Sequence, residues 1–137
     1  LEYLFERAGV FNQPLNNWNT SNVENMRGAF VGAVLFNQPL DNWDTSKVTS
    51  MEDMFHSAYA FNQDLSSWDT SKVTNMGEMF AKSTSFNQSI VNWDVSNVEN
   101  MEGMFRFTNF NRPYSLQTRL ISIVKCVVFI SLLISDL

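Results

Sequence analysis

The chain has 137 residues, and its 14 acidic side chains outnumber its 9 lysines and arginines, for a formal net charge of -5. This balance has the wrong sign for a protein that must neutralise phosphates, so we expect no nucleic-acid partner. The single cysteine, Cys126, excludes an internal disulfide framework and leaves the redox compartment open. The length is that of one domain.

One stretch of the sequence, Phe-Asn-Gln-x-Leu-x-x-Trp-x-Thr-Ser in its commonest form, returns at a constant interval. It begins at Phe11, Phe36, Phe61 and Phe86. A fixed period of about 20 to 50 residues is typical of a repeat protein. The repeats are residues 1–25, 26–50, 51–75 and 76–100, followed by a truncated fifth from Met101. The chain begins inside a repeat and without methionine, so we expect it to be a fragment.

The first part of each repeat has apolar residues at helical spacing. In the second repeat they are Met26, Ala29, Phe30 and Ala33, which together with the preceding Val23 stand at i, i+3, i+6, i+7 and i+10. A serine precedes each such segment as an expected N-cap, and in two repeats a glutamate three residues later completes a capping box. These serines are Ser21, Ser46, Ser71 and Ser96. The pattern predicts a short α-helix in every repeat.

The second part of each repeat has the Leu-x-x-Leu-x-Leu spacing of a leucine-rich repeat. In the first repeat Leu15, Trp18 and Thr20 occupy these positions. The three consecutive residues Trp18, Asn19 and Thr20 are expected to point inward, outward and inward, as in a β-strand. We therefore predict a right-handed, leucine-rich-repeat-like solenoid over residues 1–111, in which each turn is a short parallel β-strand plus a short α-helix. The expected core residues are Trp18, Trp43, Trp68, Trp93, Phe11, Phe36, Phe61, Phe86, Phe30, Phe55 and Phe80.

Residues 112–137 depart from the repeat and contain an apolar run at 120–134. A helix of that length spans about 22 Å, less than the roughly 30 Å hydrocarbon core of a bilayer. A membrane anchor is therefore less favoured than two alternatives. The segment is either a cap over the open end of the solenoid or a tail that does not belong to the native repeat protein.

The repeated pattern Phe-Asn-Gln-x-Leu-x-x-Trp-Asp-Thr-Ser-x-Val-x-x-Met-x-x-Met-Phe resembles the BspA-like leucine-rich-repeat surface proteins, over residues 1 to about 111. The resemblance implies an extracellular or cell-surface protein without enzymatic activity, whose role is adhesion or partner binding. The sequence departs from this pattern at Asn19, where aspartate is expected, and at Val95, where threonine is expected.

The outward column between tryptophan and threonine is the candidate binding site: Asn19, Asp44, Asp69 and Asp94. Like charges on neighbouring strands repel, so a bound cation such as calcium is one hypothesis. The favoured alternative is neutralisation by Lys47, Lys72 and nearby hydroxyl and N–H groups, because no glycine-rich calcium-binding pattern is present. The repeated Asn-Gln pairs that follow each phenylalanine are interpreted as structural amide ladders.

Catalysis has little support in the sequence. His56 is the only histidine and has no repeated partner, and Cys126 lies in the apolar tail without a recognisable base. One histidine and one cysteine do not make a metal-ligand cluster. We therefore expect no enzyme, no cofactor and no metal site.

The leading functional hypothesis is a surface-displayed repeat module that binds a protein or a glycan, as a monomer or as part of a longer array. Two alternatives stay open. One is a structural spacer without a ligand, and the other is a cation-loaded solenoid that uses the aspartate column.

Overall fold

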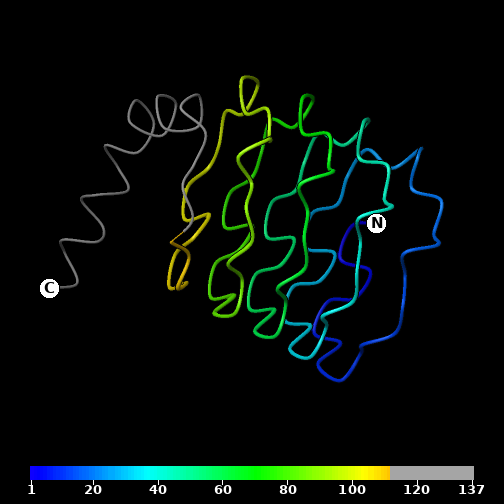
Figure 1. Cartoon of the computed structure of the whole chain (residues 1–137), viewed down its shortest axis with the longest axis vertical. Helices are drawn as coiled ribbons and strands as arrows, with labels where there is room; N and C mark the ends of the chain where they lie inside the picture. Colours follow the sequence, from blue (N-terminus) through cyan, green and yellow to red (C-terminus); the bar gives the residue numbers. More distant parts are fainter. Residues whose placement is uncertain (112–137) are drawn as a thin grey trace, which may run out of the picture.

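Successive repeats lie side by side in the computed structural model, which describes residues 1–111. Figure 1 shows them as elongated coils stacked along one axis, from the N-terminal coil in blue to the last described residues in orange. We call residues 1–25, 26–50, 51–75 and 76–100 coils 1 to 4, and a set of equivalent residues in successive coils a column. The predicted apolar segment at 120–134 lies outside the described residues.

The predicted combination of a strand and a helix in each repeat is wrong. Residues 1–111 contain no α-helix and no extended β-strand. Their β-type pairing consists of three isolated parallel bridges: Asn25 with Ser50, Ser50 with Asn75, and Asn75 with Asn100. The protein is a stack of coils built from tight turns. Within the described residues there is also no helix that is long and apolar enough to span a membrane.

The backbone of residues 26–33 explains why the expected helix does not form. The N–H groups of Ala29, Val31 and Ala33 donate to carbonyl oxygens three residues earlier, at 3.0–3.2 Å. The N–H groups between them donate to carbonyl oxygens of the next coil, at 2.8 Å. A helix satisfies its interior N–H groups within its own segment. Here every second N–H is used to join two coils.

This alternation requires two left-handed residues in each coil, in the third and seventh columns. In coil 2 they are Gly28 and Gly32, at φ 59° and 69°, and glycine adopts this conformation without steric cost. The same columns hold Tyr3, Arg7, Asp53, Ser57, Glu78, Lys82, Gly103 and Phe107, all with positive φ. The spacing of Gly28 and Gly32 was therefore a signal for turns within a segment whose apolar pattern indicated a helix.

The predicted strand is also replaced by turns. The N–H of Trp18 donates to the Leu15 carbonyl at 3.0 Å, and the N–H of Val23 donates to the Thr20 carbonyl at 2.8 Å. The parallel bridge lies further along, at Asn25. The side chains of Leu15 and Thr20 are nevertheless buried, because two consecutive tight turns place them on the same inner side as a strand would.

Two columns of phenylalanine form the centre of the core. In one column the ring centroids of Phe5, Phe30, Phe55, Phe80 and Phe105 follow one another at 5.3–5.7 Å. In the other column Phe11, Phe36, Phe61, Phe86 and Phe110 follow at 5.9–6.1 Å. The two columns touch within each coil, at 3.9–4.4 Å. Offset aromatic stacking stabilises such contacts beyond simple burial of area.

The tryptophans form a third column beside the phenylalanines. Trp43, Trp68 and Trp93 are buried, with neighbouring ring centroids 6.5 Å apart. Each indole N–H donates to a leucine carbonyl of the preceding coil at 3.0 Å, so the polar end of the ring is satisfied. Trp18, in coil 1, has one neighbouring coil in the described structure and is 42% exposed.

We predict that Trp68→Ala lowers the free energy of unfolding by about 3–5 kcal/mol, because it empties the space between two stacked rings and removes an indole hydrogen bond. Urea denaturation followed by the fluorescence of the remaining tryptophans measures the loss. Trp18→Ala is the matched control and should cost much less, because that ring is 42% exposed. Equal losses in the two variants would contradict the described core.

We predict that Lys82→Gly stabilises the protein. Lys82 is exposed and has φ 60°, which costs a side-chain-bearing residue about 1–2 kcal/mol, whereas the entropy lost by glycine on folding is about 0.5–1 kcal/mol. The expected net gain is about 0.5–1 kcal/mol in urea denaturation. The control Lys72→Gly changes an exposed lysine whose φ is not positive and should be destabilising. A loss at Lys82 as large as that at Lys72 would indicate an ordinary right-handed backbone.

Candidate functional site

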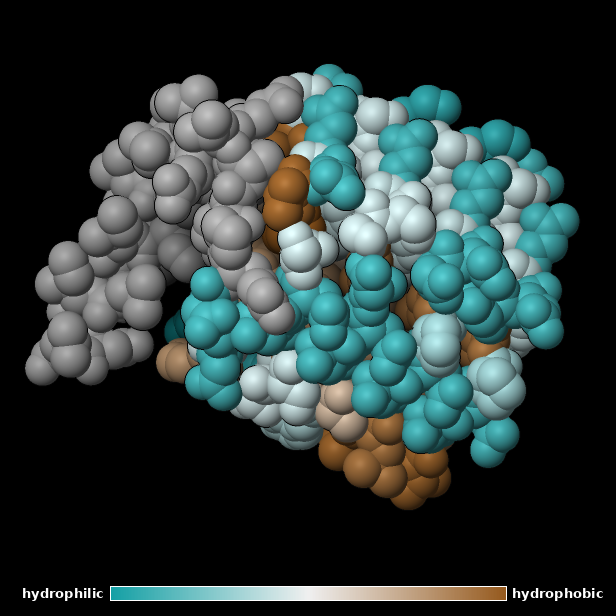
Figure 2. Space-filling model, in the orientation of Figure 1, coloured by the Kyte–Doolittle hydropathy of each residue, from teal (hydrophilic) through white to brown (hydrophobic). Residues whose placement is uncertain are grey.

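The candidate column Asn19, Asp44, Asp69 and Asp94 lies at the surface of successive coils. Asp94 is partly exposed and the other three are exposed. Figure 2 shows hydrophilic residues and residues of intermediate hydropathy over most of the visible face, with the largest apolar patch at its lower edge. Because equivalent residues of successive coils lie side by side, the structure brings the predicted residues into one row, with one residue from each coil.

Each member of this column closes a turn with the serine two residues later. The Oδ1 atom accepts the serine backbone N–H at 3.1 Å for Asn19, 3.0 Å for Asp44, and 2.9 Å for Asp69 and Asp94. At Asn19 and Asp69 the serine hydroxyl donates to the same atom, at 2.7 and 2.6 Å. The serines are thus hydrogen-bond donors in an Asx turn, and their predicted role as helix N-caps is wrong.

The same hydrogen bonds lower the pKa of the three carboxylates, so that they stay ionised to lower pH. The side-chain and backbone hydrogen bonds from Ser46 lower the pKa of Asp44, and those from Ser71 lower the pKa of Asp69. The backbone and side-chain hydrogen bonds from Ser96 lower the pKa of Asp94. The charges of Lys47 and Lys72 lower the pKa of Asp44 and Asp69 further, and at Asp69 this effect exceeds the opposing repulsion from Asp44.

A second polar row lies beside the first one. Asn17, Asn42, Ser67 and Asn92 are all exposed. The backbone N–H of Asn42 donates to Asn16 Oδ1 of the preceding coil at 3.0 Å, and the Ser67 hydroxyl donates to the Asp41 carbonyl at 2.9 Å. The exposed polar face is therefore held in place by hydrogen bonds between coils.

The asparagines that follow each core phenylalanine connect the coils. The Oδ1 atom of Asn12 accepts the backbone N–H of Asn37, and Asn37 and Asn62 repeat this contact with the next coil, each at 2.9 Å. The amide nitrogens of Gln38, Gln63 and Gln88 donate to the same oxygens at 2.9–3.2 Å. These amides form a ladder, but it joins side chain to backbone and glutamine to asparagine instead of pairing identical side chains.

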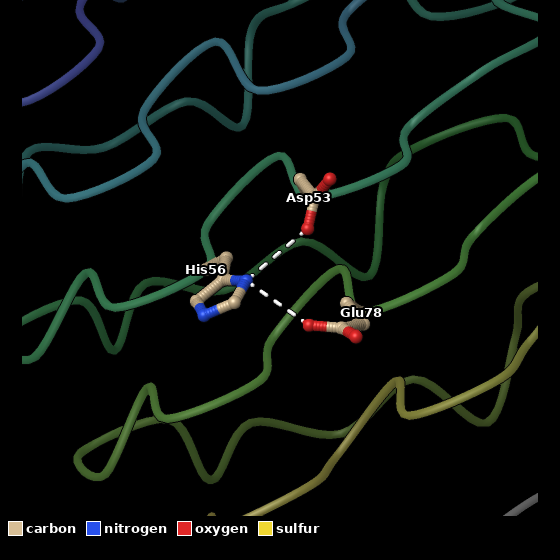
Figure 3. Close-up of side chains that lie close together, drawn as sticks. All are labelled: Asp53, His56 and Glu78. Carbon is tan, nitrogen blue, oxygen red and sulfur yellow. Dashed lines mark hydrogen bonds and ion pairs between the residues drawn. The ribbon is translucent and has the colours of Figure 1, made fainter.

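A separate cluster joins coils 3 and 4. Asp53 and His56 come from coil 3 and Glu78 from coil 4, and Figure 3 shows the imidazole ring with one nitrogen directed at both carboxylates. His56 Nδ1 lies 3.1 Å from Asp53 Oδ1 and 3.2 Å from Glu78 Oε2. Histidine, cysteine and acidic side chains are the usual metal ligands, and within residues 1–111 these three are close enough together to hold one metal ion.

This cluster is not apparent from the sequence, because His56 has no counterpart in the other repeats. Asp53 and Glu78 occupy the same column, so they are one repeat apart in sequence and adjacent in the stack. His56 follows Asp53 across one tight turn, which is closed by the bond from the His56 N–H to the Asp53 carbonyl. Carboxylates in successive copies of one column were the available signal.

The fold and its surfaces define a class of protein, namely a repeat protein of stacked coils with a hydrogen-bonded polar face. The chain belongs to the family described as "Mycoplasma protein of unknown function, DUF285", whose model matches residues 1–117. No significant match was found among curated proteins or among solved structures. The resemblance to BspA-like surface proteins stays a prediction, because the family description does not address it.

We predict that the triple variant Asp44→Asn, Asp69→Asn, Asp94→Asn loses stability less steeply in acid than the wild type. Since each folded-state pKa is lowered from 3.8, these groups contribute stability above that pH, and the contribution is lost as the pH falls through the folded-state values. Asparagine keeps the Oδ1 acceptor, as Asn19 shows, but does not titrate.

The measurement is the urea midpoint as a function of pH, from about pH 7 down to about pH 2. Asp64, whose pKa is lowered by the backbone and side-chain hydrogen bonds of Ser66, is retained in the variant and should leave a smaller residual slope. Parallel curves for the wild type and the triple variant would show that the column does not contribute to acid sensitivity.

Proposed function

We propose that the protein is a non-enzymatic binding module, displayed at a cell surface, that binds a protein or glycan partner through the face carrying Asn19, Asp44, Asp69 and Asp94. The observation that supports the proposal is the row itself: aspartates that are exposed or partly exposed repeat in coils 2 to 4, and each accepts a hydrogen bond from the serine two residues later. Partner binding at a surface is also what the BspA-like resemblance implies.

The rigidity of the row favours binding. A partner that contacts Asp44 or Asp69 does not have to order these side chains, because their turns are already closed by hydrogen bonds. Pre-organisation of this kind reduces the entropic cost of association. Successive carboxylates complement a partner with repeated lysine or arginine side chains, or the hydroxyl donors of a glycan.

A structural spacer is the second candidate. Its support is that the same Oδ1 atoms are already used to close turns within each coil, which is a sufficient structural reason for the column. In that case the regular polar face keeps the stack hydrated and separates other parts of a longer protein. The two candidates differ in whether charge on the column matters for binding.

We predict that the labelled 137-residue chain binds saturably to at least one probe in a panel of immobilised extracellular-matrix proteins and a glycan array. The triple variant Asp44→Asn, Asp69→Asn, Asp94→Asn should bind that probe at least tenfold more weakly, because it removes three charges and keeps the turns. The control variant Asp64→Asn removes one charge outside the row. Asp64 closes a similar turn, in which its Oδ1 accepts the Ser66 N–H. This variant should bind as the wild type does.

The absence of saturable binding to every probe would overturn the proposed binding function and favour the spacer. Binding that is equal for the wild type and the triple variant would overturn the assignment to this column. Surface display is tested separately with an antibody against residues 1–111 on intact and permeabilised cells of the source organism. Staining that requires permeabilisation would contradict display at the surface.

A further inference from the structure

We propose that Asp53, His56 and Glu78 bind one divalent first-row transition-metal ion between coils 3 and 4, with Zn²⁺ as the best-suited probe. The proposed site lies in columns different from those of the aspartate row, so it goes beyond the proposed function and does not depend on it. One imidazole nitrogen and two carboxylate oxygens are ligands that such ions accept.

The distances in the cluster match a coordination shell. Neighbouring ligand atoms lie about 3.3 Å apart around a tetrahedral ion with bonds of about 2.0–2.1 Å, and about 3.0 Å apart around an octahedral one. The His56 Nδ1 atom lies 3.1 Å from Asp53 Oδ1 and 3.2 Å from Glu78 Oε2. All three ligand atoms lie within 4.8 Å of one another. A modest rotation of the two carboxylates about their side-chain bonds brings the three atoms around one ion.

The charges of the cluster also favour a divalent cation. Two carboxylates share a single imidazole nitrogen, so even a protonated His56 leaves one negative charge without compensation. Within residues 1–111 the other ion pairs join Arg7 to Glu6 and Arg27 to Glu52, and neither lysine nor arginine pairs with Asp53 or Glu78. A divalent ion that replaces the proton on Nδ1 balances both carboxylates.

The backbone presents the ligands from rigid positions. Asp53 and Glu78 are consecutive members of the third column, and their N–H groups donate to carbonyls of the next coil at 2.9 and 2.7 Å. Their side chains and that of His56 are partly exposed, at 26%, 41% and 22%, so an ion can enter from solvent and keep water in its remaining positions. Nitrogen ligation distinguishes this cluster from the aspartate row, whose oxygen ligands suit calcium.

The test is a Zn²⁺ titration of the 137-residue chain, carrying Cys126→Ser so that a thiolate does not contribute a ligand. Calorimetry should give one ion per chain, and the thermal midpoint should rise with Zn²⁺. Because His56 is the only histidine, its ring signals in NMR report directly on the site, and they should shift in proportion to occupancy.

Three variants then remove one ligand each: His56→Gln, Asp53→Asn and Glu78→Gln. Each should weaken Zn²⁺ binding at least about 100-fold. Loss of a residue that only orients a metal ligand already weakens affinity by up to about 100-fold, and loss of the ligand itself should cost no less. Asp53→Asn keeps an oxygen that accepts a hydrogen bond from the imidazole, so it separates metal ligation from the internal hydrogen bond. Its urea midpoint without metal shows whether the variant is folded.

Two matched controls should bind Zn²⁺ as the parent does. Glu102→Gln removes an exposed carboxylate from the truncated fifth repeat, next to coil 4. The triple aspartate variant removes the charges of the aspartate row. No saturable binding by the parent chain, or equal binding by the His56→Gln variant, overturns the proposal. Loss of Zn²⁺ binding in the triple variant with retention in the His56→Gln variant would place the ion on the aspartate row and overturn it as well.

Discussion

The hydrogen bonds between coils determine the rest of this structure. In the third, fifth and seventh columns, the backbone N–H donates to a carbonyl of the next coil, whereas the N–H groups between them close tight turns. Backbone groups in a buried segment need partners, and this alternation supplies them without a helix or a strand. It also requires left-handed residues such as Asp53 and Glu78, whose conformational cost is balanced only when a neighbouring coil is present.

Side chains stack because the backbones do. Once successive coils are locked in the same register, Phe55 lies between Phe30 and Phe80, and Trp68 lies between Trp43 and Trp93. Polar columns follow the same rule, with amides and hydroxyls donating or accepting from one coil to the next. Because each coil covers its neighbour, stability resides largely in the interfaces, as in other repeat proteins.

The two candidate sites use this stacking in different ways. The aspartate row is a repeated feature in which each member closes its own turn. A partner would contact it as a series of carboxylates at a regular spacing. The cluster of Asp53, His56 and Glu78 occurs at one level of the stack, where two carboxylates follow one another in a column that has glycine in the coils on either side. A regular scaffold thus presents both a periodic surface and a single local site.

The sequence by itself determined the period, the columns and the identity of the residues that stack, because a residue type that recurs at a constant interval has no simpler explanation than contact with its own copies. It did not determine the backbone. Apolar spacing at i, i+3 and i+7 fits consecutive tight turns as well as a helix, and only the inter-coil bonds at residues such as Gly28 and Phe30 separate the two. The cluster around His56 was likewise decided by tertiary structure, since its ligands meet only when Glu78 of coil 4 is placed beside coil 3.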